Sequence, residues 1–280
     1  MDFIDTHQHL IYRDRLGYGW TAGIPALASG DFTIADYQAL TAGHGVTNTI
    51  FMETGVDDAD YQTEGRFIAD LMRDSASGIL GQIAACRLET DAGLSDWLDE
   101  GPSLGVVGYR RMLHIVDDDM SLQQTFRDNL RALGRRGLPF DMCFLGRQLP
   151  IARELAMACD EQILVLDHCG VPDIAGNAFE PWAKGITDLA ALPHVMCKFS
   201  GITAYCAPGT ATEATVTPWV DHVLQSFGTD RIVWGGDWPV VNLGAGLPGW
   251  IEISRSLLSR LPEAEAQAIA SGNARRIYRV

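Results

Sequence analysis

The sequence predicts a single (β/α)8 TIM barrel spanning residues 1–280, and three observations support this fold class. First, 280 residues is a usual size for such a barrel. Second, eight short apolar runs alternate with segments of helical pattern, as expected for parallel strands joined by helices. Third, the first apolar run ends in His7-Gln8-His9, whereas an open doubly wound sheet would place a glycine-rich phosphate turn there.

The expected elements follow one another without a linker, an internal repeat or a low-complexity segment, which predicts one domain. Asp31 or Thr33 is expected to cap the first helix, and Gly137 to end the helix before the fifth strand. Strands are expected over residues 1–6, 47–53, 79–86, 105–110, 139–144, 163–167, 195–199 and 231–234. Helices are expected over residues 34–43, 61–75, 91–100, 121–136, 149–159, 217–227, 247–261 and 263–278.

The composition indicates a folded protein and argues against two classes of partner. Hydrophobic residues make up 47% of the chain and charged residues 20%, so a large core is available. The formal net charge of −15 argues against nucleic acid and anionic membranes as partners. No apolar run reaches membrane-spanning length. The amphipathic outer helices show no extra apolar stripe, so homo-oligomer formation is left open.

The cysteines favour a reducing compartment. None of the six is spaced as Cys-x-x-Cys, and the first residues lack a basic segment followed by an apolar one. We therefore expect reduced thiols, most of them in the core, and a cytoplasmic protein.

Side chains suited to acid–base, metal or anion chemistry recur where the expected strands end. His7 and His9 are two residues apart on a strand, so they point to the same side. Each such residue has a structural explanation when taken alone, but together they predict an active site at the carboxyl ends of the barrel strands. The other members of this set are Glu53, Arg110, His168 and Asp237, with Arg111 and His114 just beyond the fourth strand.

A further set of residues is expected to contact a substrate. Trp20, Tyr205 and Trp238 follow strands one, seven and eight, where aromatic faces suit a sugar ring or a planar unsaturated lactone, or equally a lid over the core. A pair of neighbouring arginines suits an anion or several hydroxyls. For Glu53 the sequence leaves open a metal ligand, a partner of an imidazole or a substrate contact. The predicted substrate-binding residues are Trp20, Glu53, Arg110, Arg111, His114 and Trp238.

Six ordered motifs give the chain, from end to end, a resemblance to a known superfamily. They are residues 5–9 (Asp-Thr-His-Gln-His), 18–20 (Tyr-Gly-Trp), 166–172 (Leu-Asp-His-Cys-Gly-Val-Pro), 198–201 (Lys-Phe-Ser-Gly), 234–239 (Trp-Gly-Gly-Asp-Trp-Pro) and 272–278 (Gly-Asn-Ala-Arg-Arg-Ile-Tyr). The set resembles the amidohydrolase superfamily, in particular the amidohydrolase-2 branch of sugar-acid lactonases and of pyrone-dicarboxylate and muconolactone-type hydrolases. Single motifs are weak evidence here, but their order is specific.

The resemblance implies that His7, His9, His168 and Asp237 surround the reacting centre and that Arg110 binds the substrate. The chain lacks a lysine after the fourth strand and a histidine after the fifth, which two-metal members need. At most one divalent ion, zinc for preference, would therefore bind to His7, His9 and Asp237, with His168 or water completing the site. Members of this branch that resemble the chain include some thought to work without metal, so none is strictly required.

These expectations combine into a lactone hydrolase that opens an aldonolactone or a related carboxylated lactone by attack of water. Asp237 would be the general base, and His7, His9, a metal or Arg110 would stabilise the negative carbonyl oxygen. His168 would help protonate the leaving alkoxide. The alternatives are a muconolactone or pyrone-dicarboxylate hydrolase, a metal-dependent non-oxidative decarboxylase of the same branch, and a non-catalytic binding barrel.

Overall fold

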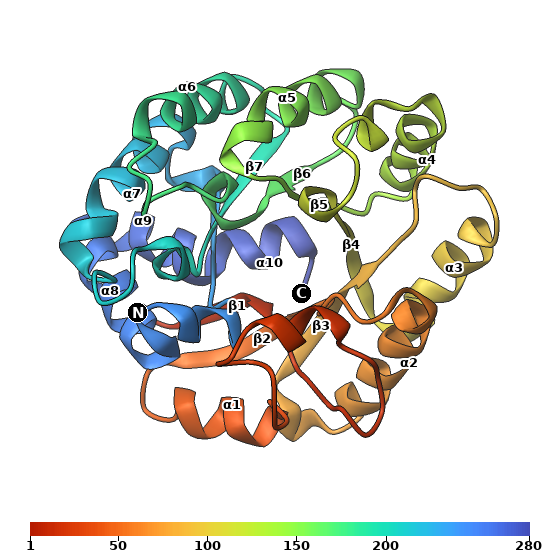
Figure 1. Ribbon diagram of the computed structural model, residues 1–280, viewed down its shortest axis with the longest axis horizontal. Helices are drawn as coiled ribbons and strands as arrows, with labels where there is room; N and C mark the ends of the chain where they lie inside the picture. Colours follow the sequence, from red (N-terminus) through yellow and green to blue (C-terminus); the bar gives the residue numbers. More distant parts are fainter.

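Eight parallel strands form one sheet in the order β1 to β8, with the helices outside it (Figure 1). The computed structural model describes all residues from 1 to 280. The strands are β1 (Phe3–Gln8), β2 (Val46–Met52), β3 (Ile79–Ala85), β4 (Val106–Met112), β5 (Phe140–Cys143), β6 (Leu164–Leu166), β7 (Val195–Ser200) and β8 (Ile232–Gly235). This arrangement confirms the predicted (β/α)8 barrel.

The outer helices follow the strands in alternation. They are α1 (Ile34–Thr41), α2 (Tyr61–Met72), α3 (Leu94–Glu100), α4 (Gln124–Arg135), α5 (Leu149–Ala158), α6 (Phe179–Ala190), α7 (Glu213–Phe227) and α8 (Gly246–Leu258), and the chain ends with α9 (Glu263–Gln267) and α10 (Asn273–Tyr278). None of them has the length and the apolar composition that a bilayer-spanning helix requires. All six cysteines are buried and free of disulfides.

The first and last strands meet where the chemistry-bearing residues lie. The backbone N–H of Asp237 donates to the carbonyl of His7 at 2.8 Å, and that of His9 donates to the carbonyl of Trp238 at 2.9 Å. Gly235 is required at this seam, because a Cβ there would lie only 2.8 Å from the Cβ of His7. Closure of the barrel therefore brings the end of β1 against the turn that follows β8.

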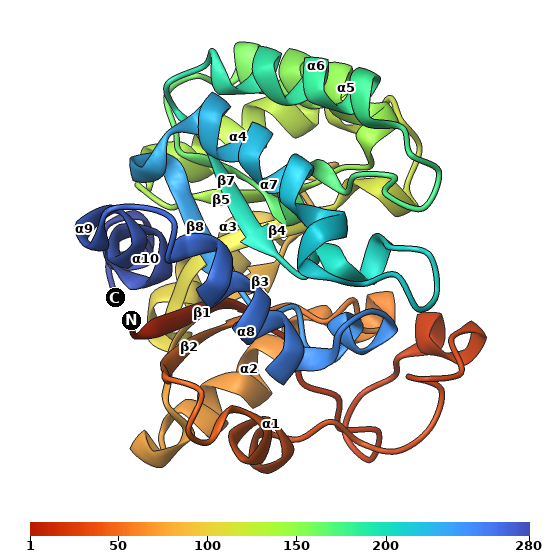
Figure 2. The same cartoon turned by 90° about the vertical axis from the view of Figure 1, so that its left-hand side faces the viewer.

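The last helix closes the opposite end of the barrel. In Figure 1, which looks along the barrel, α10 lies across the centre, and in Figure 2 both termini lie on the side away from the long segment that follows β1. Ile277 and Tyr278 pack against inward-facing strand residues such as Ile4 and Val233, all buried. The amide of Asn273 holds α10 there by donating to the carbonyl of Ile232 at 2.8 Å. The barrel is thus sealed at the strand amino ends and open at their carboxyl ends.

The structure departs from the predicted elements in several places. β1 runs two residues further than expected, to Gln8, so His7 lies within the strand. The sequence reading missed α6 altogether. The helix expected over 263–278 is interrupted by a π-helical turn, Ala268–Gly272, between α9 and α10. At the first helix the cap is Thr33 rather than Asp31, since the Thr33 side chain accepts a hydrogen bond from the Asp36 N–H at 3.2 Å.

Candidate active site

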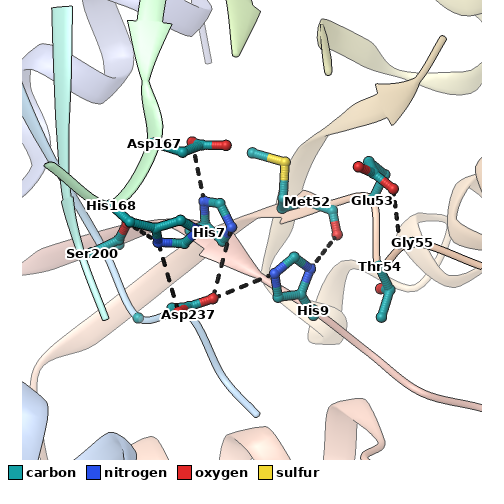
Figure 3. A network of polar contacts seen from close by, with 12 residues as sticks. His7, His9, Met52, Glu53, Thr54, Gly55, Asp167, His168, Ser200 and Asp237 are labelled. Carbon is teal, nitrogen blue, oxygen red and sulfur yellow. Dashed lines mark hydrogen bonds and ion pairs between the residues drawn. The ribbon is translucent and has the colours of Figure 1, made fainter. Parts of the chain in front are cut away.

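Three imidazoles surround one carboxylate at the carboxyl end of the barrel (Figure 3). Asp237 Oδ1 lies 3.8 Å from His7 Nε2 and 3.5 Å from His9 Nε2, and Asp237 Oδ2 lies 3.7 Å from His168 Nδ1. All four residues are buried. The structure therefore brings together the four predicted catalytic residues, which come from β1 (His7), the residue just after it (His9), the turn after β6 and the turn after β8.

Two of these residues are held by strained backbone. His168 has a φ of 51° and Asp237 a φ of 58°, a left-handed region that non-glycine residues seldom adopt. Gly201 permits the close approach of Asp237, because a Cβ at Gly201 would overlap the Asp237 carboxylate. His168 is further fixed by a 2.9 Å hydrogen bond between Nδ1 and the Ser200 hydroxyl. The turns after β6, β7 and β8 thus fix the carboxylate and the imidazole together.

The hydrogen bonds of His7 and His9 indicate which of their nitrogens are free to accept. His9 Nδ1 lies 3.0 Å from the carbonyl of Met52, and a carbonyl can only accept, so Nδ1 carries the proton. His7 Nε2 lies 3.2 Å from Arg110 Nη1, which can only donate, while His7 Nδ1 faces Asp167 Oδ1 at 3.4 Å. Burial, and next the neighbouring His168, hold the pKa of His7 well below its usual value. His7 Nε2 therefore accepts from Arg110, whereas His9 presents its Nε2 to Asp237.

Arg110 supplies the permanent positive charge of the site. Its Nε donates to Glu53 Oε1 at 2.7 Å, Nη2 to the Glu53 carbonyl at 2.6 Å, and Nη1 to His7 and to Asp167 Oδ2 at 3.3 Å. Burial lowers the pKa of Arg110, but the two carboxylates outweigh it and the net shift is upward. Four of the five guanidinium N–H groups are thereby engaged, and one on Nη2 is left for a ligand.

Glu53 acts through Arg110 rather than on a substrate. Both of its carboxylate oxygens are occupied, since Oε2 accepts from the Gly55 N–H at 2.8 Å, and it does not line the cavity. Arg110 lowers the pKa of Glu53 against the opposing effect of its burial. The predicted substrate contact at Glu53 is therefore corrected to a positioning role.

A second buried carboxyl, Glu64 of α2, supports the cavity wall from behind. Its Oε1 accepts a hydrogen bond from the Thr54 N–H at 3.0 Å, and Thr54 lines the cavity. Burial, and next the charge of Glu53, raise the pKa of Glu64 to about 8. Folded protein therefore keeps this proton at neutral pH, where an unfolded chain has lost it.

This shift predicts a pH-dependent effect of Glu64→Gln on stability. Between about pH 4.3 and pH 8 the unfolded state binds fewer protons at Glu64 than the folded state, so this carboxyl lowers wild-type stability as pH rises, by up to about 1.4 kcal/mol per pH unit. The amide keeps an acceptor for Thr54 and cannot ionise. Denaturant unfolding at pH 5 and pH 8 should show the variant gaining stability relative to wild type at the higher pH. Glu263→Gln, at an exposed position, is the matched control. If the unfolding free energies of wild type and Glu64→Gln changed with pH in parallel, the raised pKa of Glu64 would be contradicted.

A buried ionic network continues from the site towards the barrel floor. Asp167 lies 3.2 Å from Lys198 Nζ, Lys198 also pairs with Asp141, and Asp141 accepts a hydrogen bond from the Tyr278 hydroxyl at 3.0 Å. Lys198, His7 and Arg110 overcome the effect of burial and hold the pKa of Asp167 well below its usual value. Burial raises the pKa of Asp141 to about 7. An ionised Asp167 thus lies 3.4 Å from His7 Nδ1. The sequence offered only alternating polar residues in apolar strands as a signal for this network.

A cavity of about 290 Å³ opens onto the cluster. It contains six of the predicted site residues: His9, Trp20, Arg110, His114, His168 and Asp237. Burial, followed by the charge of Arg110, lowers the pKa of His114 to about 4, so this imidazole is neutral at pH 7. Sequence reasoning did not identify the apolar wall residues Met112, Ile115 and Val240, because they follow the strands without a recognisable motif.

Two predicted substrate contacts lie outside this cavity. Arg111 follows Arg110 on β4, so it points to the other side of the sheet and pairs there with Glu89 at 2.6 Å. Trp238 is buried, with its ring packed edge-on against Phe32 and Tyr37. Neither residue lines the cavity, contrary to the substrate contacts expected from the sequence.

Comparisons with known proteins identify the family. The amidohydrolase family model matches residues 4–280. This chain belongs to the amidohydrolase family. It is 29% identical to L-fucono-1,5-lactonase of Burkholderia ambifaria over 99% of this chain and 95% of the relative. It is 26% identical to 4-sulfomuconolactone hydrolase of Rhizobium radiobacter over 84% of this chain and 75% of the relative. The predicted branch and the prediction of a hydrolytic enzyme are confirmed.

A solved amidohydrolase from Burkholderia multivorans, with bound zinc, superposes on the whole chain with a TM-score of 0.90 and 28% identity; each chain is covered completely. In the amidohydrolase described here, ligand atoms of His7, His168 and Asp237 lie within 4.8 Å of one another. The predicted ligands were His7, His9 and Asp237, with His168 or water completing the site. His9 is held towards β2 by its bond to Met52, which explains why the tighter group contains His168.

This donor set fits a single divalent ion. Asp237 Oδ2 is buried and has no hydrogen-bond partner, which leaves a carboxylate oxygen available beside two imidazoles. Two histidines and one carboxylate are the donors that zinc takes in catalytic sites with an open position. A second group of possible donors, Cys143, Asp167 and His168, shares His168 with the first.

Proposed function

We propose that this amidohydrolase opens a sugar-acid lactone by attack of water on the ester carbonyl. The observation that carries the proposal is the position of the Asp237 carboxylate, 3.5–3.8 Å from three imidazoles and on the wall of a cavity that also contains Arg110. A base beside a fixed cation is what hydrolysis of an ester through a tetrahedral oxyanion requires. The names of the two lactone-hydrolysing relatives support the same reaction class.

In the proposed mechanism, Asp237 takes a proton from water as the oxygen forms a bond to the carbonyl carbon. The strained backbone of Asp237 and the close approach of Gly201 hold the carboxylate in one place, which reduces reorganisation during the reaction. His9 and His168 orient the water, because their rings border the same cavity. No covalent enzyme intermediate is required.

The carbonyl oxygen becomes negative as the tetrahedral intermediate forms. The remaining N–H on Nη2 of Arg110 is the permanent donor available to it, since burial keeps His7 neutral. Collapse of the intermediate breaks the ring C–O bond, and the proton held on Asp237 passes to the leaving alkoxide, with His168 alongside. The product is a hydroxy acid, and Asp237 returns to the carboxylate form.

His7, His168 and Asp237 would hold a divalent ion, which when bound polarises a carbonyl and acidifies water. The ion would add to the positive charge that Arg110 provides. The protein itself positions these three ligands. Ser200 contacts His168, Asp167 faces His7, and Gly201 leaves room for Asp237.

The charge of the cavity favours a neutral sugar lactone over a carboxylated pyrone or muconolactone. Arg110 is the only arginine or lysine among the lining residues, and Glu53 and Asp167 already pair with it. A substrate carboxylate would therefore find little uncompensated positive charge. Hydroxyls, in contrast, can bond to Thr54, His114 and Tyr205, while Trp20 offers an apolar face to a sugar ring.

A panel assay for acid release tests the function and the metal together. Aldonolactones and carboxylated muconolactones are given to metal-stripped and to zinc-loaded protein, with a pH indicator as the readout. We expect hydrolysis of an aldonolactone at least tenfold faster than of any carboxylated lactone. Activity that survives chelation assigns charge stabilisation to Arg110, and activity restored only by zinc assigns it to the ion. Failure with every lactone, together with release of carbon dioxide from unsaturated carboxylic acids, would replace the lactonase by the decarboxylase alternative.

A further inference from the structure

A second and larger cavity, of about 500 Å³, adjoins the active-site cavity. It lies between the loops that follow β5 and β6 and the beginning of α6, which packs beside α5 on one side of the barrel (Figure 2). The two cavities share three lining residues, Leu145, Val171 and Tyr205. The ring of Tyr205 stands edge-on to that of His168, with 6.1 Å between centroids. The second cavity therefore begins next to the reacting centre.

The walls of the second cavity are mainly apolar. Besides the shared Leu145 and Val171, the lining includes Pro172, Ala178 and Pro181. Trp182 also lines it, but its Nε1–H already donates to the carbonyl of Cys169 at 2.8 Å. Trp182 therefore contributes apolar ring surface to the cavity, and its N–H is not available to a ligand.

The charged side chains at this cavity already have partners. Arg147 pairs with Asp118 at 2.6 Å, and Asp173 Oδ1 accepts a hydrogen bond from the Gly176 N–H at 2.8 Å. Both charged residues are exposed. A charged or strongly hydrogen-bonding ligand group would have to displace these contacts. An uncharged hydrocarbon group would gain by leaving water without breaking any of them.

We propose that the second cavity is a subsite for an apolar substituent on the lactone ring, so that the substrate class extends to lactones bearing an alkyl arm. The inference rests on the proposed lactone hydrolysis, since it assumes that the ring lies beside Asp237. The arm would pass Tyr205 and lie against Val171, Pro172 and Ala178. The bonds that form and break are those of the ring ester, as for an unsubstituted lactone.

The test compares δ-hexalactone, which carries a methyl arm, with δ-decalactone, which carries a pentyl arm, and uses an aldonolactone as the reference substrate. Each methylene that enters the cavity should raise kcat/KM about fourfold, which corresponds to about 0.8 kcal/mol. We expect δ-decalactone to exceed δ-hexalactone at least tenfold in kcat/KM, chiefly through a lower KM. Equal values for the two would overturn the subsite.

Variants that fill the second cavity test whether the increase in kcat/KM arises from an alkyl arm bound there. Ala178→Phe should reduce the ratio of the two kcat/KM values at least fivefold, and Ala178→Leu should reduce it less. Ala264→Phe, at an exposed position on α9, is the control and should leave the ratio as in wild type. A ratio that persists in both Ala178 variants would place the arm elsewhere and overturn the inference. Hydrolysis of the aldonolactone without any gain from the arm overturns the subsite alone, whereas inactivity on all three lactones overturns the proposed function as well.

Discussion

Replacing Asp237 by asparagine should lower kcat for lactone hydrolysis by at least about 10³-fold, with a much smaller change in KM. A positioned general base contributes roughly 10²–10⁴-fold to such reactions, and an amide cannot take a proton from water. The substitution keeps the size and shape of the side chain. Because Asp237 Oδ2 has no hydrogen-bond partner in the protein, the amide nitrogen that replaces one oxygen need not break an internal hydrogen bond at that position.

The measurement is initial-rate kinetics on the best aldonolactone of the panel, with thermal unfolding of each protein recorded alongside. Asp70→Asn, an exposed residue on α2 paired only with Arg73, is the matched control and should retain wild-type kcat. Were Asp237→Asn to keep more than a tenth of wild-type activity, proton removal by Asp237 could not be the basis of the reaction.

Replacing Arg110 by methionine should lower both the free energy of unfolding and kcat, for two different reasons. Removing one member of a buried ion pair leaves the other uncompensated, which costs about 3–5 kcal/mol; here Glu53 loses its partner, while Asp167 keeps Lys198. Loss of a fixed oxyanion donor lowers kcat by about 10²–10³-fold. Both effects are expected in the single variant.

A double variant separates the two effects. In Arg110→Met with Glu53→Gln, the carboxylate left without a partner is neutralised, so a large part of the lost unfolding free energy should return. Catalysis should stay low, because the donor towards the carbonyl oxygen is still missing. Denaturant unfolding and kinetics on the two single variants and the double variant form a complete cycle. Recovery of activity together with stability would assign Arg110 a structural role only.

The sequence was sufficient for the barrel and for the grouping of the three histidines with Asp237, because both depend on local patterns. The spacing of His7 and His9 across the end of β1 predicts that they face the same way, and the turns after β6 and β8 carry His168 and Asp237 to the same end. The barrel geometry then brings them together without further information.

What escaped prediction depends on partners far apart in the chain. Arg110 and Arg111 were both assigned to the substrate, although strand alternation allows only one of them to face inward; choosing between them requires knowing that Glu53 and Asp167 lie opposite Arg110. Trp238 follows a strand end as Trp20 does, yet its ring turns into the core against Phe32. The choice between cavity and core depends on packing between distant segments, which a motif does not encode.

The position of α10 has a consequence for the order in which the molecule can assemble during synthesis. The floor of the barrel is made from α10, which is synthesised after all eight strands, and β1 contacts its second neighbour only when the residues around Asp237 have emerged. Until then Asp141 lacks Tyr278 and the inward apolar residues of β1 and β2 face solvent. Nascent chains should therefore remain protease-sensitive until α10 has emerged, and only then can the barrel exclude water from its buried charges.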